Sequence, residues 1–372
     1  MVTLTLRNSE GARPAPVAGI AKLAPYKQGK ATLSNVAEPL KLSSNESMIG
    51  PSPKALAAYQ ATGTRLHLYP DGSQQALRTA IAKVHGLDAD RLVCGNGSDE
   101  LIQLLIRAYA GPGDDVVLSQ YSFGMAFVHA IAQGANAIAV DEPDLKPDVD
   151  ALLAAVTPKT KMVILASPNN PVGQYLPRAE LLRLHAGLPP HVILLLDSAY
   201  ADYVVADDYE AGASLVGAHG NVVMTRTFSK LYGLAGLRIG WMYAPEAVID
   251  AVQRIRTPFN ANSAALAAAE AAVRDVEHAA LAREENRAEL TRIAETLTAV
   301  GIEFVPSVAN FYLIRFPMEG RDPAGAAAHL EANGIIPRPV NAGGPEASLR
   351  ITVGRPHQND RVIAALREYV KA

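Results

Sequence analysis

The chain has 372 residues, a net charge of −3 and 49% hydrophobic residues, which is the composition of an ordinary globular protein of about two domains. Slight acidity without a dense run of Lys or Arg disfavours a nucleic-acid-binding function. The single cysteine, Cys94, excludes disulfide frameworks and cysteine metal sites, and we expect no bound metal. The first ten residues do not resemble a secretory signal, and no run reaches the ~20 apolar residues of a membrane helix. A cytoplasmic enzyme is therefore expected.

The first 45 residues are rich in proline, glycine and alanine, which predicts an irregular arm that packs on a partner. From residue 52 onward, short apolar runs alternate with amphipathic ones. Helices are predicted at 52–61, 73–85, 98–109, 122–133, 149–156, 178–185 and 246–256. Strands are predicted at 115–119, 137–140, 162–166, 192–196, 221–224 and 237–243. This alternation indicates the α/β class, with a mainly parallel sheet covered by helices on both faces.

The last third of the chain changes character. Residues 263–300 are alanine-rich and predict a helical stretch with a break near Asp275. Short strands at 303–306, 310–316 and 348–353 then mix with helices at 323–333 and 359–369, which is typical of a smaller α+β domain. We therefore predict an N-terminal arm at 1–45, a large domain at 46–260, and a small C-terminal domain with its linker helix at 261–372.

One lysine stands out by its surroundings. Lys230 follows the apolar run 221–224, with hydroxyls at Thr227 and Ser229 and an arginine, Arg238, eight positions further on. A lysine in apolar surroundings tends to lower its pKa or to bond covalently to a carbonyl, and lysine forms Schiff bases with pyridoxal phosphate (PLP). The hydroxyls and Arg238 would suit a phosphate dianion. A surface lysine in a glycine-rich loop is the alternative interpretation.

Two further stretches fall at predicted strand ends, where a doubly wound sheet gathers its ligands. Residues 94–100 turn from a strand into a helix through two glycines, which lets backbone N–H groups approach an anion; a merely capped helix start is the alternative. Asp197 ends an apolar strand, where an unpaired carboxylate is costly, and a protonated pyridine nitrogen would be a suitable partner. Tyr200 follows at a spacing that could return its hydroxyl to the same pocket. The alternative is a capping aspartate beside a core tyrosine.

Two more motifs carry polar groups in rigid settings. Residues 168–171 read Pro-Asn-Asn-Pro after a strand, a stiff turn that presents amide side chains, although it could be a tight turn only. Arg350 lies on the apolar strand predicted at 348–353. A half-buried arginine suits a carboxylate ligand, and a structural ion pair is the competing interpretation.

Together these stretches resemble the fold-type I PLP-dependent aminotransferases, and most of all the histidinol-phosphate aminotransferase family. The matching motifs are 42–46 (LSSNE), 69–71 (YPD), 95–100 (GNGSDE), 167–173 (SPNNPVG), 197–200 (DSAY), 227–240 (TFSKLYGLAGLRIG) and 349–354 (LRITVG). They extend over nearly the whole chain. The resemblance implies a large PLP-binding domain, a smaller domain, and PLP as the cofactor.

The resemblance also implies a role for each matched residue. Lys230 would bond covalently to PLP and then move the proton, Asp197 would keep the pyridine nitrogen protonated, and Tyr200 would bind the ring's phenolic oxygen together with Asn170. The residues implied around the phosphate are Gly97, Ser98, Asp99, Thr227, Ser229 and Arg238. Tyr69 would reach the phosphate of a neighbouring subunit, which implies a homodimer with shared sites.

Three positions depart from the family pattern. The stacking position is usually tyrosine, whereas here residues 120–123 offer Tyr121 and Phe123, and we expect Phe123 over the ring. Val172 replaces a threonine and Ser198 replaces a glutamate. Both of these changes lie away from the key atoms.

The resemblance implies a ping-pong reaction, with an amino donor, a 2-oxo acid acceptor, and glutamate and 2-oxoglutarate as the common pair. The predicted substrate-binding residues are Tyr26, Asn45, Arg338 and Arg350. Tyr26 and Arg338 would hold the phosphate of imidazole-acetol phosphate, or they are structural. Arg350 would bind the substrate α-carboxylate or, with histidinol phosphate, lie near the alcohol end.

The open alternatives are an aromatic amino acid aminotransferase and a PLP decarboxylase or lyase. A transcription regulator with an aminotransferase-like domain is disfavoured, because the proline-broken first 45 residues cannot supply a helix-turn-helix module.

Overall fold

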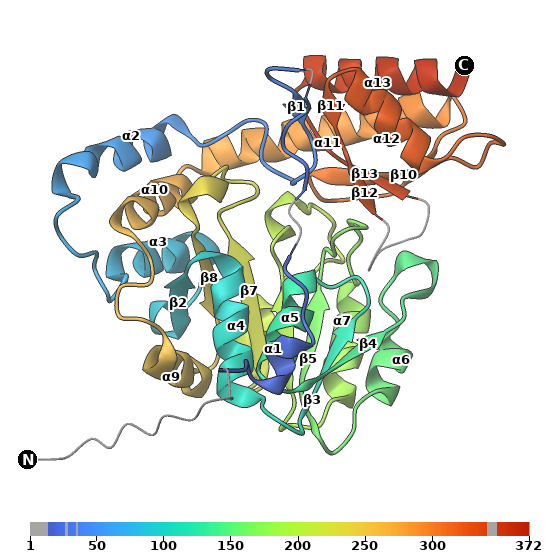
Figure 1. The fold of residues 1–372 in the computed structure, drawn as a ribbon. Coiled ribbons are helices and arrows are strands. Elements are labelled where there is room, and N and C mark those ends of the chain that lie inside the picture. Colours follow the sequence, from blue (N-terminus) through green and yellow to red (C-terminus); the bar gives the residue numbers. More distant parts are fainter. Residues whose placement is uncertain (1–13, 27–28, 35, 341–347, 372) are drawn as a thin grey trace, which may run out of the picture.

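The computed structural model describes residues 14–26, 29–34, 36–340 and 348–371. Its largest sheet has seven strands in the order β2-β8-β7-β6-β5-β3-β4 (Figure 1). The strands are β2 (Leu92–Gly95), β3 (Asp115–Ser119), β4 (Asn136–Val140), β5 (Thr160–Ala166), β6 (Ile193–Asp197), β7 (Val222–Thr227) and β8 (Gly240–Tyr243). Only β8 runs antiparallel to its neighbours in this sheet. The predicted mainly parallel sheet is confirmed.

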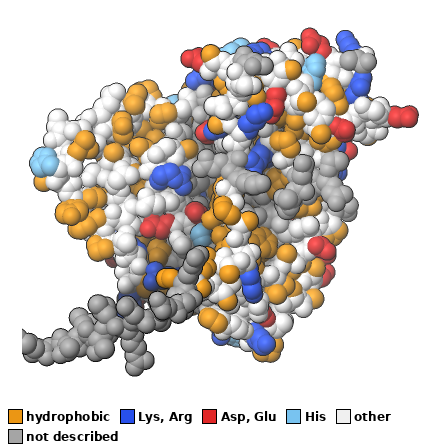
Figure 2. Space-filling model, in the orientation of Figure 1, with side chains coloured by type: hydrophobic (Ala, Val, Ile, Leu, Met, Phe, Trp, Pro, Cys, Tyr) orange, Lys and Arg blue, Asp and Glu red, His pale blue; other side chains and the backbone are white. Residues whose placement is uncertain are grey.

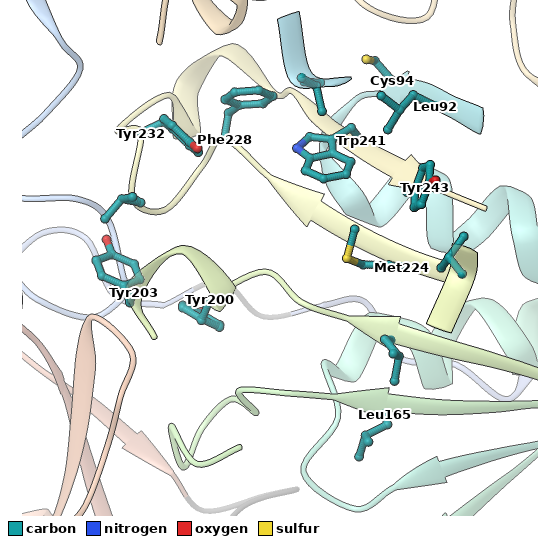
Figure 3. Close-up of a cluster of buried hydrophobic side chains, with 14 of the residues drawn as sticks. Leu92, Cys94, Leu165, Tyr200, Tyr203, Met224, Phe228, Tyr232, Trp241 and Tyr243 are labelled. Carbon is teal, nitrogen blue, oxygen red and sulfur yellow. The ribbon is translucent and has the colours of Figure 1, made fainter. Parts of the chain in front are cut away.

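Helices cover both faces of this sheet. One face packs against α3 (Gln75–His85), α6 (Val149–Ala154), α7 (Arg178–Gly187), α8 (Ala213–Ala218) and α10 (Ser263–Arg274). The other face packs against α4 (Gly97–Tyr109), α5 (Gly124–Ala132) and α9 (Glu246–Ile255). Because successive strand residues point to opposite faces, the continuous apolar run of β6 supplies Leu194 and Leu196 to one core and Leu195 to the other. Figure 3 shows the first of these cores, where Met224 of β7 lies near Trp241 and Tyr243 of β8.

The remaining helical segments of the large lobe are short. They are α2 (Pro53–Ala61) and the 3-10 turns η1 (Gly63–Arg65), η2 (Ala89–Arg91), η3 (Pro143–Leu145), η4 (Ala201–Tyr203) and η5 (Ala235–Leu237). The strand predicted at 237–243 begins only at Gly240, because η5 precedes it and Arg238 adopts a left-handed conformation with φ 55°. The helix predicted at 122–133 begins at Gly124, since residues 119–122 form a turn closed by the Ser122 N–H on the Ser119 carbonyl at 2.9 Å.

The C-terminal part has its own core and sheet. Four antiparallel strands lie in the order β12-β13-β10-β9: β9 (Glu303–Val305), β10 (Phe311–Arg315), β12 (Arg338–Val340) and β13 (Ser348–Thr352). Three helices, α11 (Val276–Thr298), α12 (Pro323–Ala332) and α13 (Pro356–Lys371), pack with them at the top of the molecule in Figure 1. Asp275 separates α10 from α11, so the predicted break is confirmed.

Residues 40–42 of the arm join this smaller core, whereas the earlier segment 18–21 packs against α5 of the large lobe. After the single-turn helix α1 (Ala18–Ala21), the strand β1 (Leu40–Lys41) pairs in parallel with β11 (Ile335–Ile336), and Leu40 and Leu42 are buried in the same cluster. The domain limits at 45 and 260 remain a proposal. Within the described ranges, no helix has the length and apolar character needed to cross a bilayer.

Candidate active site

The parallel strands β5, β6 and β7 end at one cavity of about 260 Å³. Its lining combines loops from both lobes and contains most of the predicted cofactor residues. The lining residues are Ser44, Glu46, Ser98, Asp99, Phe123, Ala166, Pro168, Asn170, Asp197, Ala199, Tyr200, Thr227, Ser229, Lys230, Ala235 and Arg238. The chain therefore brings residues that lie up to 194 positions apart, from Ser44 to Arg238, to the carboxyl edge of one sheet, as the strand pattern predicted.

Asp197 forms the floor of the cavity at the end of β6. It is buried, and among the described residues its carboxylate accepts hydrogen bonds from two neutral donors, the Thr225 hydroxyl at 3.5 Å and the Ala199 backbone N–H. Burial raises the pKa of Asp197 to about 6, against the smaller opposing effect of the Ala199 hydrogen bond. A cation beside this carboxylate would favour its ionised form, so a protonated ring nitrogen fits the position.

Lys230 directly follows Phe228 and Ser229, the two residues after β7, and it lines the cavity. Its Nζ donates to the Asn45 carbonyl at 3.4 Å and lies 5.5 Å from the centroid of the Tyr200 ring. The Tyr200 hydroxyl accepts a hydrogen bond from Asn45 Nδ2 at 3.0 Å. The lysine amine is thus directed at the predicted cofactor residues, and the interpretation as a plain surface lysine is wrong.

The opposite end of the cavity is rich in donors. Helix α4 begins at Gly97, so the N–H groups of its first turn face the loop that carries Arg238. Arg238 Nη1 donates to the Ser229 hydroxyl at 3.3 Å, and Thr227 lies 3.1 Å from the same hydroxyl. A side chain at Gly97 would place its Cβ 2.6 Å from Arg238 Nη2. Glycine at this position therefore permits the positive φ of 77° at the helix start and leaves room for the Arg238 side chain beside it.

Asp99 is the exception among these donors. Its carboxylate accepts a hydrogen bond from His129 Nε2 of α5 at 3.0 Å. Asp99 also lies close enough to Asp197 to raise the pKa of that carboxyl group further. The structure therefore places Asp99 at the cavity, as predicted, but as a negative charge held by a neighbouring helix.

Arg350 of β13 contacts Asn170, a residue of the cavity lining, without lining the cavity itself. Its Nη1 donates to Asn170 Oδ1 and its Nη2 donates to the Ser43 carbonyl at 2.7 Å, while its buried Nε has no hydrogen-bond partner among the described residues. Burial lowers the pKa of Arg350 to about 10. Because no described acidic residue forms an ion pair with it, the structural ion-pair interpretation is not supported.

A second cavity of about 420 Å³ adjoins the first, since Phe123 and Asn170 line both. Tyr26 and Arg338, the predicted phosphate residues of the substrate, line this second cavity together with Arg350. Phe127 adds an apolar wall. The structure therefore gathers three of the four predicted substrate residues at one opening, and the fourth, Asn45, lies between the two lobes on Tyr200.

Tyr69 lies outside both cavities. Its ring is 83% exposed, stacks on Phe259 at 4.7 Å, and lines a separate hollow of about 430 Å³ beside α10. It cannot contribute to the cavity of its own chain. A role in a neighbouring subunit stays a prediction.

Several residues in the cavity lining or in contact with the site residues were not predicted. Thr225 reaches Asp197 because β6 and β7 pair these two residues in register, which the sequence does not reveal. Asn310 donates to the Asn45 carbonyl at 3.0 Å from 265 positions away. Ser43 and Ser44 fall inside the motif 42–46, which was the only signal that could have identified them.

These groups fit a phosphorylated pyridine aldehyde. The cavity offers an amine at Lys230, a buried carboxylate at Asp197, and a helix start with Arg238 at the far end. Over the ranges that the structure describes, no group of three His, Cys, Asp or Glu side chains could hold a metal ion.

Comparison with known proteins gives a consistent result. The family model "Aminotransferase class I and II" matches residues 37–366. The histidinol-phosphate aminotransferases of Paramagnetospirillum magneticum and Rhodospirillum centenum are each 48% identical to the chain, over 360 and 358 residues, which is 96% of this chain and 99% of each relative.

Solved structures agree. A histidinol-phosphate aminotransferase from Sinorhizobium meliloti in complex with pyridoxal-5'-phosphate has a TM-score of 0.87 and 28% identity, and the match covers 98% of this chain and 99% of that one. An aspartate aminotransferase from Thermus thermophilus, with a TM-score of 0.78 and 20% identity over 89% of this chain and 91% of its own, shows the shared fold alone. The arrangement of the strand ends and these matches lead to one conclusion: the chain belongs to the class I and II aminotransferase family.

Proposed function

We propose that this protein uses PLP to transfer the amino group of histidinol phosphate to 2-oxoglutarate, which yields imidazole-acetol phosphate and glutamate in histidine biosynthesis. The observation that carries the reaction class is the single cavity that joins Lys230, Asp197 and Arg238. The substrate is supported by relatives of 47–48% identity that bear the name histidinol-phosphate aminotransferase.

PLP, when bound, supplies an electron sink for the electrons released at the substrate's α-carbon. Lys230 Nζ holds the cofactor between turnovers and carries the proton to and from that carbon. The Asp197 carboxylate would keep the pyridine nitrogen protonated, because a buried carboxylate without an ion-pair partner among the described residues is stabilised by a cation beside it. Tyr200 and Asn170 orient the ring, and Phe123 packs over it.

The substrate side depends on arginines. Arg350 has a buried Nε without a partner among the described residues, which suits the carboxylate of glutamate or 2-oxoglutarate. Arg338 and Tyr26, at the rim of the adjoining cavity, would bind the phosphate of histidinol phosphate.

An aromatic amino acid aminotransferase is the second candidate. Phe123 and Phe127 both line the cavity beside Arg350, so an aromatic side chain could pack there while Arg350 holds the carboxylate.

A homodimer with shared sites is part of the proposal. Exposed apolar side chains gather near Tyr69, namely Leu66, Leu68 and Phe259, and such patches mark protein–protein contacts. Figure 2 shows hydrophobic side chains over the lobe that carries α2 and α3. The cytoplasmic location rests on the sequence only.

The test is a steady-state comparison of L-histidinol phosphate and L-phenylalanine with 2-oxoglutarate, following glutamate. We expect kcat/KM for histidinol phosphate to be higher by about 100-fold, because hydrogen bonds from a charged group contribute about 1.5–3 kcal/mol and phenylalanine lacks the phosphate that would accept them. Arg338→Ala should lower only the histidinol phosphate value. The reverse preference would make this an aromatic aminotransferase, and amine consumption without glutamate would indicate a decarboxylase or lyase.

A further inference from the structure

A buried amide side chain lies behind the start of helix α4. Gln74 is 2% exposed, its Nε2 donates to the Cys94 carbonyl at 2.9 Å, and its Oε1 accepts from the Cys94 N–H at 2.8 Å. β2 is an edge strand of the seven-stranded sheet, paired only with β8. At Cys94, where the turn 94–100 begins, the Gln74 amide thus forms the two backbone hydrogen bonds that a neighbouring strand would otherwise form.

A second buried amide completes the arrangement. Asn260 Oδ1 accepts from Gln74 Nε2 at 2.9 Å, and its Nδ2 donates to the Cys94 carbonyl at 3.1 Å and to Glu100 Oε2 at 2.9 Å. The same Glu100 oxygen accepts from the Asn96 N–H at 2.6 Å. The two amides therefore hold both ends of the turn 94–100, which contains Gly97, the first residue of α4.

The backbone around Gln74 supports a positional role. Gln74 has φ 58°, a left-handed conformation that side chains rarely adopt and that persists only where surrounding contacts enforce it. Arg256 supplies such a contact, because its Nη2 donates to the Gly72 carbonyl at 2.6 Å and its Nη1 donates to Asn260 Oδ1 at 3.3 Å. Three chain segments, 71–74, 94–100 and 256–260, are fastened at one point.

We infer that Gln74 and Asn260 are positioning residues that set the phosphate-binding end of the site. Neither lines the 260 Å³ cavity, so each acts through the turn 94–100. The inference rests on the proposed function, because it requires a phosphate at the start of α4. It predicts that disturbing the amides weakens binding through the phosphate group and leaves the chemistry at Lys230 intact.

Gln74→Glu is the sharpest variant. It keeps the size of the side chain and the oxygen that accepts from the Cys94 N–H. It replaces the Nε2 donor with a carboxylate oxygen, which then faces two other acceptors, the Cys94 carbonyl and Asn260 Oδ1. The matched control is Gln75→Glu, the same change at an exposed neighbour whose Nε2 contacts only Thr79, at 3.1 Å. Both full-length, cofactor-free proteins are titrated with PLP and with pyridoxal, which lacks the phosphate, while absorbance and thermal unfolding are recorded.

We expect Gln74→Glu to raise the Kd for PLP about tenfold and to leave the Kd for pyridoxal unchanged, with Gln75→Glu equal to the wild type for both. Asn260→Asp, which removes the other donor, should reproduce this selective loss and serves if Gln74→Glu does not fold. Equal weakening of PLP and pyridoxal, or a lower unfolding temperature with unchanged PLP affinity, would overturn the inference. A wild-type protein that gives no visible band with PLP would instead refute the proposed function.

Discussion

Two buried arginines on opposite sides of the site have different partners. Arg226 of β7 and Arg350 of β13 are each 9% exposed. Burial alone would lower the pKa of Arg226, but the Asp202 carboxylate raises it overall through an ion pair. Within the part of the chain that the structure describes, Arg350 donates to the neutral oxygens of Asn170 and Ser43 alone, and burial lowers its pKa to about 10.

The comparison distinguishes an arginine that stabilises the fold, Arg226, from an arginine that is available to bind a ligand, Arg350. Asp202 accepts from the Tyr232 hydroxyl at 3.3 Å, and its carbonyl accepts from Arg283 Nε of α11 at 2.7 Å, so the Arg226 pair fastens three elements beneath the site. Such a pair is complete within the chain. Arg350 is equally buried without a described counter-charge, and a substrate anion would supply one.

The largest expected effect is on the structural side. Asp202→Asn keeps the shape of the side chain but leaves Arg226 buried without an ionised partner, which should lower the free energy of unfolding by about 3–5 kcal/mol. Denaturant unfolding measures this change. Asp207→Asn, at an exposed position of the same stretch, is the control and should change stability by less than about 0.5 kcal/mol. If Asp202→Asn lowered the free energy of unfolding no more than Asp207→Asn does, the Arg226–Asp202 pair would have no structural role.

The second effect falls on catalysis. Arg350→Leu removes a cation that has no ion-pair partner among the described residues but leaves the Ser43 carbonyl without its donor, so we expect stability to fall by about 1–2 kcal/mol, less than the loss from an unpaired buried charge. In contrast, kcat/KM for glutamate should fall about 10²–10³-fold, because truncating a charge that binds a ligand anion costs about 2–5 kcal/mol. Arg226→Leu should show the opposite balance, with stability lost. If Arg350→Leu mainly unfolded the protein, Arg350 would have a structural role like that of Arg226, and the proposed difference between them would be wrong.

The third effect tests the carboxylate on the site's floor. The pKa of Asp197 is raised to about 6 from its usual 3.8, so the folded state keeps this proton over a range where the unfolded state loses it. The stability of the cofactor-free protein is therefore fullest below pH ~4 with respect to this group, and it is lost as the pH rises through about 6.

Asp197→Asn is neutral at every pH and should make the cofactor-free protein more stable by about 1–3 kcal/mol at pH 8, with the difference vanishing near pH 4. Denaturant unfolding at both pH values is the measurement. A wild-type protein that is the more stable one at pH 8 would contradict the buried, unpaired state of Asp197.

The smallest effect concerns the helix start. Gly97→Ala forces a left-handed residue with φ 77° to carry a Cβ that lies 2.6 Å from Arg238 Nη2, and we expect the Kd for PLP to rise about fivefold to tenfold. Gly236→Ala, in the same loop as Arg238 but with open space around its Cβ position, should leave the Kd unchanged. Equal effects of the two variants would show that the close approach of Gly97 and Arg238 has no consequence for binding.

Much of the site follows from local sequence. Asp197 ends an apolar run and Lys230 lies in a glycine-rich stretch with Arg238, and parallel strands bring their ends to one edge. These signals predicted the class of the fold and, within the lining of the 260 Å³ cavity, Asp197, Lys230 and Arg238. The strands β1, β11 and β12 were missed because two or three residues are too few to show a periodicity.

The contacts that hold the site residues in place could not be predicted from the sequence, for a different reason. The Gln74 side chain forms hydrogen bonds with the backbone of Cys94, 20 positions away, and Arg226 forms an ion pair with Asp202, 24 positions away. Such pairs depend on strand register and on how loops fold back, and a single sequence carries no trace of either. The difference between Arg226 and Arg350 is likewise invisible in the sequence, where both are arginines in apolar strands.

The central claim, that Lys230 carries the chemistry, has a direct test. The purified protein is loaded with PLP, reduced with borohydride and digested, and the modified peptide is identified by mass spectrometry. The account predicts a phosphopyridoxyl group on Lys230, with a visible absorbance band that glutamate bleaches and that Lys230→Ala lacks. A modification on another lysine, or an unchanged band in Lys230→Ala, would contradict it.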